Sequence, residues 1–344
     1  MTKSGFNGKI ILKTVLFLSV LVLILIWRCT YSARYYSITG FTQGTTYHIT
    51  YEIRGETDLK PEVDSILNDF DHSLSTYIPN SVISEINRNV PGIEADEHFI
   101  KVFNKSYEVY LNTDGAFDIT VAPIVNALGF GFTKKVHVDS ALIDSLLQYV
   151  GMNKVKLSGK KVIKQFPETM FDVNAIAQGY SVDVVSAYFD KLGIKNYLIE
   201  IGGEIRTKGR NSKKEDWKIG IDKPIENNMI PGESLQTILK LTNKSLATSG
   251  NYRKFYEEDG VKYAHSIDPK TGYPVLTRLL SATVVANDCM TADAYATAFM
   301  VMGLEKSIDY LSKHKELQGY LIFGGKDGNF ETYITEGLRN EVME

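Results

Sequence analysis

The segment 287–303, NDCMTADAYATAFMVMG, places the strongest constraint on the fold. A helix this rich in alanine and methionine is expected to be buried. Asp293 and Thr297 nevertheless lie one turn apart and share one of its faces. A buried carboxylate must be paired or bound to a metal, because removing it from water alone is costly. Two interpretations follow: helix N-capping by Asp293 with a backbone hydrogen bond from Thr297, or a metal site.

The composition excludes two classes of protein. Hydrophobic residues make up 44% of the 344 positions and charged residues 23%, which is typical of a globular chain rather than a disordered one. The net charge of -3 lacks the basic excess that phosphate contacts require. We therefore expect one large or two modest domains and no nucleic-acid partner.

An apolar segment at 9–29, KIILKTVLFLSVLVLILIWRC, precedes the globular part. Lys3 and Lys9 stand at its start and Lys13 within it. Snorkelling of Lys13 brings the apolar length close to the roughly 20 residues that a membrane span needs. Because the lysines come first, the remaining chain is expected outside the cytoplasm, on the periplasmic side of a bacterial inner membrane.

The fate of this segment is open at the level of the sequence. We favour an uncleaved anchor, with 1–34 as anchor and tether and 35–344 as the folded domain. A cleaved signal peptide is the alternative. Cys29 also stands where a bacterial lipoprotein carries its acylated cysteine, but Arg28 replaces the small residue expected before it. With Cys289 the only other cysteine, no disulfide framework is expected.

Periodicity predicts an α+β fold after the tether, because helical and strand patterns alternate without regular βαβ units. A glycine in the C-cap position is expected to close the third and fourth helices, at Gly151 and Gly193. Hairpin signals, EEDG, DPKTG and GKDG, accumulate in the last hundred residues. The expected helices cover 60–79, 96–115, 140–151, 175–193 and 287–303, and the expected strands cover 47–53, 196–209 with a turn at Gly202–Gly203, and 217–222.

Four other stretches are too polar and glycine-rich for packing alone. Two of them hold carboxylates, Asp114 and Asp118 in TDGAFD and Asp172 before a helix in DVNAIAQG. Turns and helix capping explain such carboxylates, although a helix start also suits a phosphate. The other two are a double glycine in YLIEIGGEIRTKG and a strand-like run that carries His265. A lone histidine is by itself an ordinary structural residue.

The order of these stretches resembles the FAD:protein FMN transferases, the ApbE family. The resemblance covers about residues 40–335, which is nearly the whole part outside the membrane segment. Seven motifs in the same order carry it. They are FTQGTTYHI, LSTYIPNSVISEIN, TDGAFDITVAPIVNALGFG, DVNAIAQGYSVDVV, IEIGGEIRTKG, ATSGNYRKFYEEDGVKYAHSIDPKTGYP and CMTADAYATAFMVMG.

The resemblance implies an ApbE-like fold, with mixed or antiparallel sheets and flanking helices, and a defined reaction. Such enzymes bind FAD and Mg²⁺, transfer the FMN half to a threonine or serine of a target flavoprotein and release AMP. By resemblance, Asp293, Thr297 and the backbone carbonyl of Ala175 are the metal ligands. Oxygen ligands of this kind suit magnesium, and no cysteine–histidine cluster indicates zinc.

The resemblance also implies the FAD-binding residues. Gln43 stands where the family's first motif usually has methionine. Gln178 stands where the family often has lysine, so a direct charge on the pyrophosphate is missing. Either His265 or Asp293 is expected to deprotonate the acceptor hydroxyl. The implied FAD contacts are Gln43, Ser75, Tyr77, Ala116, Phe117, Asp118, Gln178, His265 and Ile267.

Two other functions compete with transfer. An FAD pyrophosphatase would use the same site with water as the acceptor, and a non-catalytic FAD-binding lipoprotein would leave FAD intact. For the transferase, the resemblance implies an acceptor in a membrane redox complex, such as the flavoprotein subunit of a Na⁺-translocating NADH:quinone oxidoreductase.

Overall fold

The protein is described by a computed structural model. The structure describes residues 8–30, 33–55, 57–132, 138–225, 232–251, 255–258, 261–264 and 266–343, and for 23–30, 255–258 and 261–264 it describes the backbone alone. Helix α1 (Gly8–Thr30) comes first, and its described side chains are exposed. Among the residues with described structure, no helix is both long enough and apolar enough to cross a membrane.

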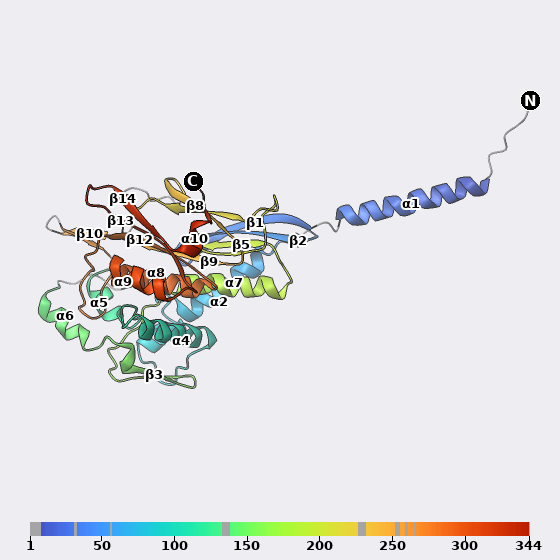
Figure 1. Cartoon of the computed structure of the whole chain (residues 1–344). Coiled ribbons are helices and arrows are strands. Elements are labelled where there is room, and N and C mark those ends of the chain that lie inside the picture. The colour runs from blue at the N-terminus through green and yellow to red at the C-terminus, as the bar shows by residue number, and fades with distance from the viewer. Residues whose placement is uncertain are drawn as a thin grey trace, which may run out of the picture.

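An eight-stranded sheet forms the centre of the fold (Figure 1). Its neighbouring strands all pair antiparallel, which agrees with the predicted α+β class. The strands, in spatial order, are β1 (Ala33–Thr42), β2 (Thr45–Arg54), β5 (Tyr197–Ile201), β6 (Glu204–Lys208), β9 (Ser245–Gly250), β12 (Leu279–Ala286), β13 (Gln318–Gly324) and β14 (Phe330–Ile334). β1 begins at Ala33, two residues before the start of the predicted folded domain at residue 35.

Most helices cover one face of this sheet (Figure 1). α7 contacts β5 and β6, and α8 contacts β9 and β12. The helices after α1 are α2 (Lys60–Leu74), α3 (Val82–Asn87), α4 (Glu97–Asn112), α5 (Ala122–Ala127), α6 (Ser140–Leu147), α7 (Ala177–Lys191), α8 (Cys289–Met302), α9 (Leu304–Lys313) and α10 (Glu336–Arg339), with a short 3₁₀ turn η1 (Met152–Lys154).

A smaller sheet covers the opposite face of the large one. It consists of β7 (Trp217–Asp222), β8 (Leu235–Leu241) and β15 (Val342–Met343). Strand alternation separates the two cores: Val284 faces the helices, and its neighbour Val285 packs with Trp217 of the small sheet. Two hairpins stand apart from both sheets, β3 (Val155–Ser158) with β4 (Lys161–Lys164) and β10 (Phe255–Glu258) with β11 (Val261–Ala264).

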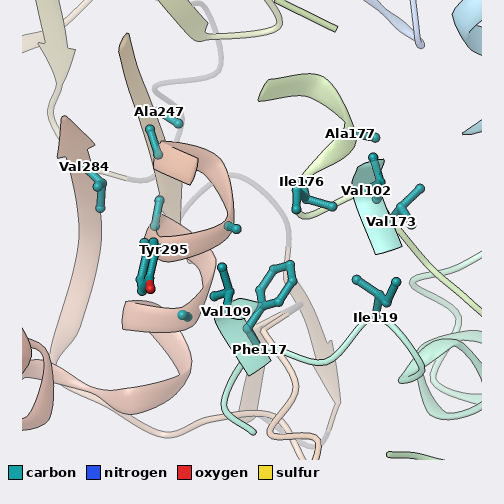
Figure 2. Close-up of a cluster of buried hydrophobic side chains, with 14 of the residues drawn as sticks. Val102, Val109, Phe117, Ile119, Val173, Ile176, Ala177, Ala247, Val284 and Tyr295 are labelled. Carbon is teal, nitrogen blue, oxygen red and sulfur yellow. The ribbon is translucent and has the colours of Figure 1, made fainter. Parts of the chain in front are cut away.

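The predicted burial of the alanine-rich helix is confirmed. α8 lies between the sheet and the outer helices, and Asp293 is among its buried residues, with 5% of its surface exposed. Figure 2 shows Phe117 and Val109 close to this helix, with Ile176 at the start of α7 lining the same core. The carboxylate is therefore placed in an apolar interior, where it needs partners.

The largest differences between predicted and observed helix ends are at the C-termini of α2 and α6. α2 ends at Leu74, before the predicted stop at Pro79, because Ser75 is already extended. α6 ends at Leu147, so Gly151 is not its cap. Gly193 does close α7 as predicted: it follows the C-cap residue Leu192 and has φ 74°, a conformation that glycine favours at this position.

Candidate active site

Two hairpin turns and the start of α7 meet at one end of the large sheet. The turn of the β1–β2 hairpin is formed by Gln43 and Gly44, and the predicted turn at Gly202–Gly203 joins β5 and β6. The amide of Gly202 donates to the Thr46 carbonyl at 3.1 Å, which holds the two turns side by side. A side chain at Gly202 would collide with the amide of Gln178 in the first turn of α7. The expected FAD contacts Gln43 and Gln178 thus come from neighbouring elements.

Asp293 lies against the start of α7. Its Oδ2 accepts a hydrogen bond from the backbone N–H of Gly179 at 3.0 Å. Gly179 lies in the first turn of α7, which starts at Ala177, and first-turn amides have no carbonyl partner within their own helix. The Asp293 carboxylate is therefore bonded to the helix start that follows the predicted ligand Ala175 by two positions in the chain.

The close approach of the two helices depends on Gly179. A Cβ added there would lie 2.7 Å from the Cβ of Asp293 and would also meet the carbonyl of Cys289. Real Cβ atoms do not make contacts this short. Glycine at this position lets α7 and α8 touch through their backbones, which brings the carboxylate within hydrogen-bonding distance.

The capping interpretation of Asp293 is wrong for its own helix. The N-cap of α8 is Asp288, whose side chain accepts from Thr291 N at 2.8 Å. Thr297, the predicted partner one turn beyond Asp293, is half-buried and shares a hydrogen bond of 3.0 Å with the Ser249 hydroxyl of β9. Its hydroxyl is thus linked to the sheet.

Burial, with a smaller contribution from the nearby Asp183 carboxylate, raises the pKa of Asp293 to about 7, and the hydrogen bond from the Gly179 N–H opposes the shift. A bound cation would offset this cost of ionisation. Within the described ranges, no group of three or more histidine, cysteine, aspartate or glutamate side chains is arranged to hold a metal. The expected set of one carboxylate, one carbonyl and one hydroxyl would suit Mg²⁺, which keeps waters or phosphate oxygens in its other positions.

The start of α7 is suited to a phosphate. Its N-cap residue, Ile176, makes no side-chain bond to the first-turn amides. The amides of Ala177 and Gly179 are bonded to Val173 O and Asp293, so the amide between them, Gln178 N–H, is the candidate phosphate contact. The positive end of the helix dipole also lies there. Gln178 contributes an uncharged amide at this point. Neutralising the negative charge of a pyrophosphate would therefore depend on the backbone and a metal.

Gln43 has an unusual environment for a polar residue. It adopts a left-handed conformation with φ 51°. Within the described part of the chain, neither Nε2 nor Oε1 of its buried amide has a hydrogen-bond partner. Leaving such groups unsatisfied costs free energy, and a ligand with both a donor and an acceptor would remove that cost.

Tyr77 and Ser75 lie after α2, near the segment that leads into α7. Tyr77 is 66% exposed, which leaves its ring accessible to a planar ligand. Partial burial and the neighbouring Asp172 carboxylate raise the pKa of Tyr77. Ser75 is half-buried, and its hydroxyl accepts from the Tyr77 backbone N–H at 3.3 Å.

Three predicted FAD contacts have side chains that point into the protein. Phe117 belongs to the main core (Figure 2). Ile267, with 6% exposure, packs in a smaller core beside α5 and α6. Asp118 accepts from the hydroxyl of Thr120 at 2.6 Å and from Met152 N at 3.1 Å. At these positions only the backbone is left to contact a ligand. Ala116, next to Phe117, is half-buried.

His265, the predicted base, lies outside the described residues. Asp183 was missed by the sequence reasoning, although it lies in the motif GYSVD four residues after Gly179. Its carboxylate accepts hydrogen bonds from Cys289 N at 2.9 Å and Met290 N at 2.8 Å. Only the pairing of α7 with α8 reveals this role.

Comparison with known proteins decides the family. The family model described as "ApbE family" matches residues 43–321. The chain belongs to the ApbE family. This membership confirms the resemblance inferred from the seven motifs.

Named relatives of this ApbE-family chain are transferases. An FAD:protein FMN transferase of Haemophilus influenzae is 36% identical, with 87% of this chain and 90% of the relative covered. One from Vibrio cholerae is 35% identical, with coverage of 92% and 96%. The predicted enzyme class, a transferase, is thereby confirmed.

Solved structures of the family share the fold of this ApbE-family chain. A flavin transferase from Vibrio cholerae matches with a TM-score of 0.81 at 34% identity, covering 90% of this chain and 99% of that one. A flavinyl transferase from Pseudomonas stutzeri in its apo form matches with a TM-score of 0.80 at 29% identity, covering 90% and 97%. The predicted ApbE-like fold is confirmed for the domain.

Proposed function

We propose that this chain is a magnesium-dependent FAD:protein FMN transferase. It moves the FMN half of FAD to a threonine or serine hydroxyl of a target flavoprotein and releases AMP. The observation that carries this proposal is the contact between Asp293 and Gly179 at 3.0 Å, which joins a buried carboxylate to the start of α7. The activity of the named relatives supports the same reaction.

The reaction exchanges one phosphorus–oxygen bond for another. The acceptor oxygen bonds to the phosphorus on the FMN side of the pyrophosphate, and the bond from that phosphorus to the oxygen bridging to AMP breaks. AMP leaves with this oxygen, and the acceptor hydroxyl loses its proton to a base. We propose His265 as this base and Asp293 as the alternative.

Residues of the site divide the remaining tasks. Asp293, Thr297 and the Ala175 carbonyl would hold Mg²⁺, which neutralises pyrophosphate charge and polarises the phosphorus when bound. The Gln178 N–H at the start of α7 is proposed to contact a phosphate, because the neighbouring amides of Ala177 and Gly179 are bonded to Val173 O and Asp293. Gln43 and Tyr77 are proposed to contact the flavin, Gln43 through its amide and Tyr77 through its exposed ring.

Product analysis tests the reaction. The purified protein is incubated with FAD, Mg²⁺ and an acceptor flavoprotein domain, and the products are measured by mass spectrometry and nucleotide chromatography. We expect a covalent FMN adduct on one threonine or serine together with an equal amount of AMP. Free FMN and AMP without an adduct would indicate a pyrophosphatase, and intact FAD would indicate a binding protein.

We also propose that α1 is an uncleaved anchor in the bacterial inner membrane, with the domain in the periplasm. The lysines before the apolar segment and the exposure of apolar side chains on α1, such as Leu12 at 71% and Phe17 at 66%, support this proposal. In cell fractionation, the intact chain should be in the inner membrane, and protease added from the periplasm should digest the domain. A soluble product that begins near Cys29 would contradict the anchor, and a lipid on Cys29 would indicate a lipoprotein.

The acceptor is proposed to be a flavoprotein subunit of a membrane redox complex, such as a Na⁺-translocating NADH:quinone oxidoreductase. A periplasmic location of the transferase would place it beside such a subunit. Comparing flavinylated peptides from cells with and without this protein tests the proposal. An unchanged set of peptides would refute it.

A further inference from the structure

The starts of α7 and α8 are bonded to each other in a reciprocal way. Asp293 of α8 accepts from Gly179 N of α7 at 3.0 Å. Asp183 of α7 accepts from Cys289 N of α8 at 2.9 Å. Gly179 precedes Asp183 by four residues, and Cys289 precedes Asp293 by four. Each helix thus gives a carboxylate, four residues beyond its own bonded amide, to the first turn of the other.

These contacts form a closed ring of two helical turns and two links between the helices. Asp183 also accepts from Met290 N at 2.8 Å, and Asp288 accepts from Thr291 N at 2.8 Å. The first three amides of α8 are therefore all bonded to carboxylates. Because a helix leaves these amides without internal partners, their bonds fix where the helix starts and how it is oriented. Asp293 lies one turn further along the same rigid helix.

We propose that Asp183 is a positioning residue for the metal site: by holding the first turn of α8 it sets where the Asp293 carboxylate lies relative to the Ala175 carbonyl. This inference rests on the proposed function, because it concerns the same magnesium site. Asp183 makes its bonds to backbone amides of α8 and acts on the site through Asp293.

The ring explains why the two links depend on each other. Weakening the Asp183 bonds lets the start of α8 move away from α7. The same movement lengthens the bond between Asp293 and Gly179, because one helical turn separates Cys289 from Asp293. A metal ligand that loses its supporting contacts binds its metal about 10–100-fold more weakly.

Two variants test the role of Asp183 in the full-length protein in detergent. Asp183→Asn keeps the size but gives an NH₂ group where one backbone N–H needs an acceptor. Asp183→Glu keeps the charge but moves the carboxylate by one methylene. Binding of Mn²⁺, used as the probe for the magnesium site, is followed by electron paramagnetic resonance in the presence of FAD. Both variants should need about 10-fold or more Mn²⁺ for half-saturation.

Steady-state kinetics separates positioning from a general structural effect. The Mg²⁺ concentration for half-maximal rate should rise in both variants, and kcat at saturating Mg²⁺ should largely recover. A purely structural residue would instead reduce the amount of active protein and leave the Mg²⁺ midpoint unchanged, which would overturn the proposal.

The matched control is Asp288→Asn. It removes one negative charge from the same end of α8, but asparagine still accepts the bond from Thr291. Its Mn²⁺ midpoint should stay close to that of the unmodified protein. If Asp288→Asn shifts the midpoint as much as Asp183→Asn, or if Asp183→Glu binds like the unmodified protein, charge alone acts and positioning is refuted.

Failure of the proposed function has a different signature. If the unmodified protein shows no saturable Mn²⁺ binding with FAD, the magnesium site itself is refuted, and the positioning role with it. If the unmodified protein binds Mn²⁺ and both Asp183 variants bind it equally well, only the role of Asp183 is refuted.

Discussion

Helix propensity and tertiary packing predict opposite effects of the substitution Gly179→Ala on the stability of the protein. Propensity alone predicts that Gly179→Ala stabilises the protein by about 1 kcal/mol, because alanine is the best helix former. The structure predicts the opposite. The new Cβ would lie 2.7 Å from the Cβ of Asp293 and 2.8 Å from the carbonyl carbon of Cys289. Carbon atoms pack at roughly 3.5 Å or more, so α7 and α8 would have to separate by about 0.8 Å.

This separation determines the size of the effect. It would lengthen the bond between Gly179 N and Asp293, now 3.0 Å, beyond hydrogen-bonding distance. Overpacking costs about 1–3 kcal/mol, and losing a hydrogen bond to a buried charged group costs about 1.5–3 kcal/mol. After subtracting the gain of about 1 kcal/mol from propensity, we expect the free energy of unfolding to fall by roughly 1.5–5 kcal/mol.

Urea denaturation of the full-length protein, followed by circular dichroism, measures this change. Gly324→Ala is the matched control, because no atom lies within 4 Å of the added Cβ and the site has ordinary backbone geometry. The control should change stability by less than about 0.5 kcal/mol. A Gly179→Ala protein that is as stable as the unmodified one, or more stable, would refute the close contact between the helices.

Four further substitutions test the site and its surroundings. Asp293→Asn keeps the shape but removes the charge, so the Mg²⁺ dependence of transfer should move to much higher concentrations; an unaltered dependence would refute the metal site. His265→Ala should slow transfer by roughly 10²–10⁴-fold while FAD still binds, and a near-normal rate would mean that the base lies elsewhere. Gln43→Met should raise the free energy of unfolding without FAD by about 1 kcal/mol, because it removes two unsatisfied buried atoms; in calorimetry with FAD, binding should weaken, and unchanged affinity would exclude a flavin contact through the amide. Burial lowers the pKa of Lys164 to about 8, so the folded state binds fewer protons than the unfolded state between pH 8 and the usual lysine value of 10.5. The stability of the unmodified protein relative to Lys164→Met should therefore rise with pH across that window, and a difference in urea midpoints that does not change with pH would contradict the lowered pKa.

Much of the architecture follows from local patterns. The apolar stripe at helical spacing predicted the helix observed as α4, and the double glycine predicted the turn between β5 and β6. These features depend on neighbours within a few residues, which a single sequence displays. The β1 strand was missed, because its polar and aromatic residues become a strand only through pairing with β2.

The predicted site residues were identified by motif, and their roles depend on packing. The motif identifies Asp118 as an FAD contact. In the structure its carboxylate accepts hydrogen bonds from the Thr120 hydroxyl and from Met152 N. The motif identifies Gln43 as an FAD contact in place of the usual methionine, but only the structure shows that its amide is buried without a partner among the described residues. Sequence spacing cannot distinguish these cases, because the partners of Asp118 and the burial of Gln43 are set by distant segments.

The sequence by itself determined that 287–303 is a buried helix and that Asp293 needs a partner there, because burial and the cost of desolvation are properties of the residues. Only the tertiary structure decided what that partner is. The amide of Gly179 lies 114 positions earlier in the chain, and it reaches Asp293 because a glycine lets the two helices touch. The return bond from Asp183 to the first turn of α8 depends on the same contact, since it exists only where α7 and α8 are packed together.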